Sequence, residues 1–64
     1  MISLVQAQDR FVQRVNNCHP GHFSRVRSSA WKELYTWAKK RGYDAVQICR
    51  DADDVAKLER NADD

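Results

Sequence analysis

The sequence predicts an all-α fold, a small bundle of three helices over residues 3–17, 22–41 and 45–61. The chain has 64 residues but only two glycines and one proline, too few turn residues for many short strands. Its apolar residues recur at spacings of three and four, the period of an amphipathic helix. We therefore expect residues 1–64 to form a single small helical domain of marginal stability.

The first helix is predicted by a start signal and an apolar stripe. Ser3 and Gln6 fit a capping box, in which each side chain satisfies a free backbone amide of the first turn. The stripe that follows has helical spacing and consists of Leu4, Ala7, Phe11, Val15 and Cys18, with Val5 and Val12 at its edge. The polar residues on the opposite side are Arg10, Gln13, Arg14 and Asn17.

The second helix has a clear end and an open start. Its apolar set is Trp31, Leu34, Tyr35 and Ala38, bordered by Ala30 and Trp37. The helix begins either near Pro20, a favoured first-turn residue, or after Ser28 or Ser29, which can act as caps. Basic residues suit its last turn, and Gly42 predicts a left-handed stop.

The third segment permits two interpretations. Asp44 and Gln47 fit a second capping box, which favours a helix over 45–61, and a cap at Asp51 or Asp53 would divide it and give a fourth helix. The alternative is an α+β fold with a short strand at 43–49, which would need residues 23–27 as its partner. We favour the helix. Residues 61–64 are expected to be a frayed acidic tail.

Charge is distributed unevenly along the chain. Nine basic and two acidic residues lie between Arg10 and Arg50, whereas six acidic and two basic residues follow from Asp51 onward. Several cations on one surface bind a phosphate backbone by releasing counterions. The candidate nucleic-acid-binding residues are Arg25, Arg27, Lys32, Lys39, Lys40 and Arg41. The leading hypothesis is therefore a small regulatory or accessory protein, not an enzyme, that binds nucleic acid through a basic helical face.

The aromatic residues support a different hypothesis. Trp31, Tyr35 and Trp37 form a wide arc that so short a chain has difficulty covering, and Trp and Tyr are common anchors at interfaces. The alternative function is thus a protein-interaction module or small inhibitor that uses this arc without nucleic acid. A homodimer is expected under either hypothesis, with the basic middle of one subunit facing the acidic end of the other.

A local cluster of cysteine and histidine residues is a weak candidate for a metal site or a catalytic site. Cys18, His19 and His22 lie close together, and Cys49 could complete four zinc ligands, but the spacing lacks the two ligand pairs of structural zinc sites. A nucleophilic Cys18 would need a base, an orienting group and a cleft. We therefore predict no metal, no cofactor and no catalytic residue.

The expected compartment follows from what the sequence lacks. No apolar run approaches the roughly 18 residues of a membrane span, and the first residues do not resemble a signal peptide. Two cysteines are too few for a disulfide scaffold. We expect a cytoplasmic protein with no membrane partner, located at the nucleoid or in the nucleus if it binds nucleic acid.

Overall fold

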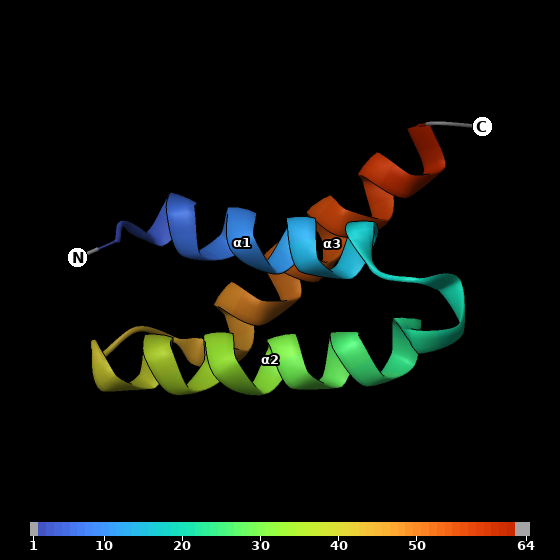
Figure 1. Ribbon diagram of the computed structural model, residues 1–64. Helices are drawn as coiled ribbons and strands as arrows, with labels where there is room; N and C mark the ends of the chain where they lie inside the picture. Colours follow the sequence, from blue (N-terminus) through green and yellow to red (C-terminus); the bar gives the residue numbers. More distant parts are fainter. Residues whose placement is uncertain (1, 63–64) are drawn as a thin grey trace.

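Three helices form the fold in the computed structural model, which describes residues 2–62. They are α1 (Leu4–Asn17), α2 (Phe23–Lys40) and α3 (Ala45–Ala62). Figure 1 shows α1 and α2 side by side in opposite directions, while α3 crosses both diagonally. The described residues contain no strand, so the all-α prediction is confirmed and the strand at 43–49 is not found.

The start of α1 has the predicted capping box. The Gln6 amide donates to Ser3 Oγ at 3.2 Å, and the Ser3 amide donates to Gln6 Oε1 at 2.9 Å. The buried residues of this helix are Ala7, Phe11, Val12 and Val15. Val5 differs from the expectation, because it lies in the first turn near the end of the bundle and is 74% exposed.

The chain enters α2 by the earlier of the two predicted starts. Pro20–His22 form one 3₁₀ turn (η1). The His19 side chain caps this turn, because its Nδ1 accepts a hydrogen bond from the Gly21 amide at 3.1 Å. α2 then begins at Phe23, so the alternative starts at Ser28 and Ser29 are wrong.

Gly42 ends α2 as predicted, with φ at +78°. The Tyr43 amide donates to the Ala38 carbonyl and the Gly42 amide to the Lys39 carbonyl, which together form a Schellman motif.

α3 is one continuous helix. Its capping box is only half formed: the Gln47 amide donates to Asp44, but the Gln47 side chain donates to Asp51 instead. Neither Asp51 nor Asp53 interrupts the helix, so the bundle has three helices within residues 2–62. Positions 61 and 62, expected in the tail, are helical, and positions 63–64 lie outside the described residues.

The core has twelve buried apolar residues, and six of them are alanines. Such small side chains let the helix backbones approach closely where they cross. Two side-chain hydrogen bonds from α1 to backbone carbonyls help fix it against α3: Gln8 Nε2 donates to the Ile48 carbonyl and Asn16 Nδ2 to the Ala56 carbonyl, both at 3.2 Å. Each bond joins residues 40 positions apart, so the two helices run in the same general direction.

Candidate functional site

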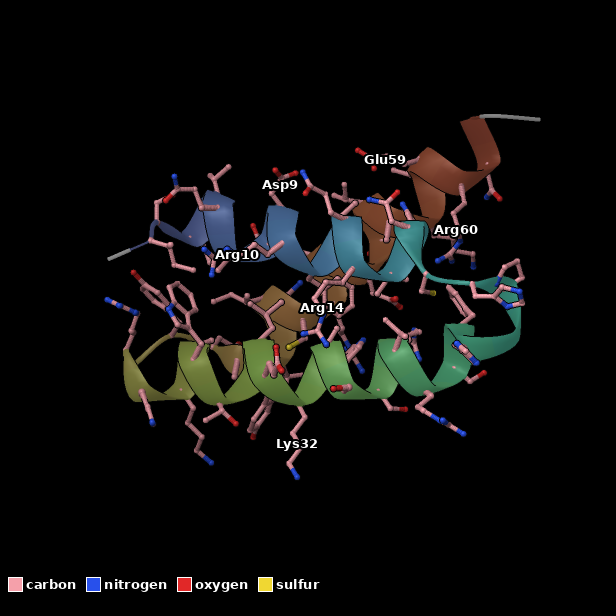
Figure 2. All side chains as sticks on the ribbon, viewed as in Figure 1. Asp9, Arg10, Arg14, Lys32, Glu59 and Arg60 are labelled. Carbon is pink, nitrogen blue, oxygen red and sulfur yellow. The ribbon has the colours of Figure 1, made fainter. Side chains whose placement is uncertain are left out.

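Three of the six predicted basic residues form a row along the outer face of α2. Arg25, Lys32 and Lys39 are each seven residues apart, which places them about 10.5 Å apart along the helix axis and within about 40° around it. All three are exposed, and Figure 2 shows Lys32 directed away from α1 and α3. We call this row the α2 basic stripe. Lys40 is exposed on the neighbouring flank.

The α2 basic stripe has one acidic neighbour, Glu33, which lines a shallow surface depression together with Lys32, Thr36 and Lys40. The other exposed residues between its members carry hydroxyl groups: Ser28, Ser29 and Thr36. The one acidic residue of α2 is Glu33, which forms an ion pair with Arg14 of α1. Arg25, Lys32 and Lys39 themselves form no salt bridge within residues 2–62.

Arg27 and Arg41 do not belong to the stripe. Arg27 donates to both carboxylate oxygens of Asp53 on α3, at 2.9 and 2.7 Å, and its guanidinium lies 5.8 Å from the centre of the Trp31 ring. Arg41 caps the end of α2 and lies 4.9 Å from the centre of the Trp37 ring. The sequence could have indicated that these two arginines lie off the stripe. Arg27 follows Arg25 by two positions and Arg41 follows Lys39 by two, and two helical positions turn a side chain by about 200° around the axis.

The Arg27–Asp53 pair links α2 to α3 and alters the protonation of both groups. The hydrogen bond with Arg27 lowers the pKa of Asp53, against a smaller opposing effect of burial. The same hydrogen bond raises the pKa of Arg27. Because the Arg27 side chain is 41% exposed, solvent weakens the attraction, and the pair contributes about 1 kcal/mol.

Replacing Asp53 with asparagine should lower the free energy of unfolding by about 1 kcal/mol at pH 7. The contribution of the Asp53 charge is complete above the unfolded-state pKa of about 3.9 and is lost as the pH falls through the lowered folded-state pKa. Urea unfolding of both proteins at pH 7 and at about pH 2 tests this. A difference of equal size at both pH values would contradict it.

The predicted aromatic interface is divided between two sides of α2. Trp31 and Tyr35 are half-buried against the core, and the Cys49 thiol donates to the Trp31 carbonyl at 3.6 Å. Trp37 lies about 120° from Trp31 around the helix axis, on the side of α2 that faces α1. Its ring packs against that of Tyr43, with centroids 5.8 Å apart. These three aromatic residues therefore do not form one continuous surface.

The Cys/His residues are also separated. Cys49 is fully buried in the core, whereas Cys18 is half-buried and donates to the Val15 carbonyl at 3.2 Å. His19 and His22 are exposed, with ring centroids 5.4 Å apart. Across residues 2–62 the structure brings together no three Cys, His, Asp or Glu side chains that could hold a metal ion.

The two thiols should differ sharply in reactivity. Burial raises the pKa of Cys49 and also shields it, whereas Cys18 is partly accessible. Since thiolates are the reactive species, Cys18 should react with an aromatic disulfide reagent at least about 100-fold faster than Cys49 in the folded protein. In urea both should react at similar rates. Equal rates in the folded protein would contradict the burial of Cys49.

A groove of about 500 Å³ between α1 and α2 was not anticipated from the sequence. Its apolar lining consists of Ile2, Ala7, Phe11, Ala30, Leu34 and Trp37. Arg10 and Arg14 line it from α1 and point toward α2 in Figure 2. The Arg14–Glu33 ion pair crosses it. We call it the α1–α2 groove. Arg10, Gln13 and Arg14, which were predicted to lie opposite the apolar stripe of α1, thus border this groove.

Within residues 2–62 no helix combines the length and apolar character needed to cross a membrane. Comparison with protein-family models, curated proteins and solved structures finds no significant match.

Proposed function

We propose that this chain binds nucleic acid through the α2 basic stripe and acts without catalysis, as a regulatory or accessory protein. The observation that carries the proposal is an exposed row of cations, Arg25, Lys32 and Lys39, on a helix whose one acidic residue, Glu33, is paired with Arg14 of α1. Lys40 adds a fourth cation on the adjacent flank. Arg27 and Arg41 are left out because Arg27 pairs with Asp53 and Arg41 lies at the C-cap, beyond the helical residues of α2.

The geometry of the stripe suits a phosphate backbone. Its ends, Arg25 and Lys39, are about 21 Å apart along the axis, the length of about six base pairs of duplex. The serine and threonine hydroxyls between the cations are groups that commonly donate to phosphate oxygens. Contacts of this kind position a protein on nucleic acid without reading bases. We therefore expect binding that depends weakly on sequence.

The test is binding to a mixed-sequence DNA duplex, measured by fluorescence anisotropy between about 25 and 200 mM salt. If the four cations each neutralise one phosphate, the logarithm of the affinity should fall against the logarithm of salt with a slope of about −3.6. A single-stranded RNA of equal length measures the preference for nucleic-acid type. Undetectable binding at the lowest salt, or a slope near zero, would overturn the proposal.

The protein-interaction alternative retains one residue of its predicted surface. Trp31, Tyr35 and Trp37 are all half-buried against the core, but of the three only Trp37 also lines the α1–α2 groove. A protein partner would therefore use this groove rather than the predicted arc.

A further inference from the structure

The outer face of α3 carries two apolar side chains that are exposed on the surface of the bundle. Val55 and Leu58 are 46% and 69% exposed. Asp51 and Asp54, also exposed, complete an i, i+3, i+4, i+7 set with them. This is the spacing with which a helix places one face against a partner. We call these four residues the α3 outer face: two apolar side chains bordered by two carboxylates.

The α1–α2 groove has the opposite character. Its floor is apolar, formed in part by Leu34 and Trp37, and its α1 border carries Arg10 and Arg14. Glu33 already neutralises Arg14. Arg10 has no carboxylate within 4 Å among the residues that the structure describes. The groove therefore suits a helix that presents apolar residues beside acidic ones.

We propose that the α3 outer face of one copy of this chain docks into the α1–α2 groove of a second copy. Val55 and Leu58 would cover the groove floor, and the aspartates would lie on the side of Arg10, the groove cation that has no carboxylate partner. Charge complementarity fixes this choice of occupant. The α2 basic stripe is a poorer match for the α3 outer face, because it consists of Arg25, Lys32 and Lys39 and offers no apolar side chain to cover Leu58.

This contact is heterologous, since it joins two different surfaces. Such contacts build rings or open chains rather than closed symmetric pairs. One helix face in one groove is a small interface, below about 1,200 Å² in total, so the association is weak and we expect it near about 100 μM. The α2 basic stripe stays outside the contact, so assembly and nucleic-acid binding are independent.

The experiment uses sedimentation of the full chain from about 10 μM to 1 mM, together with two variants. Arg10→Glu alters the groove and Leu58→Lys alters the α3 outer face. The wild type should exceed its monomer mass of 7.5 kDa as concentration rises. Each variant alone should stay monomeric. An equimolar mixture should form a two-chain species, because one variant keeps an intact groove and the other an intact outer face.

Control variants keep the outcomes interpretable. Val5→Lys changes an exposed apolar residue that belongs to neither surface and should associate as the wild type does. Asp54→Lys is a second alteration of the outer face, for use if Leu58→Lys loses helicity. In heteronuclear NMR the indole signal of Trp37 should shift with concentration while that of Trp31, whose Nε1 is buried, does not.

Three results would overturn the proposal. The wild type stays monomeric at about 1 mM. Alternatively, Leu58→Lys and Asp54→Lys both associate normally, which removes the α3 outer face from the contact. In the third case the wild type associates but the mixture of variants stays monomeric, which indicates a symmetric contact between identical surfaces.

Discussion

Replacing Phe11 with alanine is expected to lower the free energy of unfolding by about 3–5 kcal/mol at 25 °C. Phe11 is 2% exposed at the centre of the α1 stripe and is the largest side chain among the twelve buried core residues. Removing a buried phenylalanine ring costs about 3–5 kcal/mol, because both apolar contact and packing are lost. A domain of this length is stabilised by only about 3–10 kcal/mol. Urea titration followed by far-ultraviolet circular dichroism measures the loss.

A matched substitution on the same helix isolates the effect of burial. Val5→Ala also removes apolar atoms, but Val5 is 74% exposed. It should change the free energy of unfolding by less than about 0.5 kcal/mol. If Phe11→Ala costs no more than Val5→Ala, then α1 does not pack on the other helices as the structure describes.

The parts of the fold that could be predicted depend on local chemistry. The Ser3/Gln6 capping box and the stop at Gly42 act within a few residues, and both formed as predicted. The start of α2 remained open because Pro20 and two serines all offer acceptable local starts. Tertiary packing selects the start of α2, because the earlier start lets Phe23 pack against the core.

The candidate site was harder to predict because it depends on which helices meet. Charge along the chain suggested one basic region and one acidic region, but folding brings parts of them together. Arg27 pairs with Asp53 of the acidic region, 26 positions away, and within the basic region Arg14 pairs with Glu33, 19 positions away. Arg25, Lys32 and Lys39 on the outer face of α2 stay exposed and form a row without a salt bridge among the described residues. The α1–α2 groove likewise arises from two helices, and no spacing within one helix reveals it.

Reversing two charges of the α2 basic stripe should nearly abolish nucleic-acid binding. In the double variant Lys32→Glu, Lys39→Glu, each change removes a phosphate contact and adds a repulsive charge. We expect the affinity at low salt to fall by about 100-fold, and the salt slope of the residual binding to become shallower by about 2. Both side chains are exposed, so the helical content should be unchanged.

The control for this prediction is the double variant Arg50→Glu, Lys57→Glu on α3. Its residues are also exposed, basic and seven positions apart, and both double variants lower the formal net charge of +2 by the same four units. If net charge alone governs binding, the two variants should lose affinity equally. If the row on α2 is the contact surface, the α3 variant should lose no more than about threefold through the weaker long-range field. Equal losses would therefore refute a localised site even though nucleic acid binds.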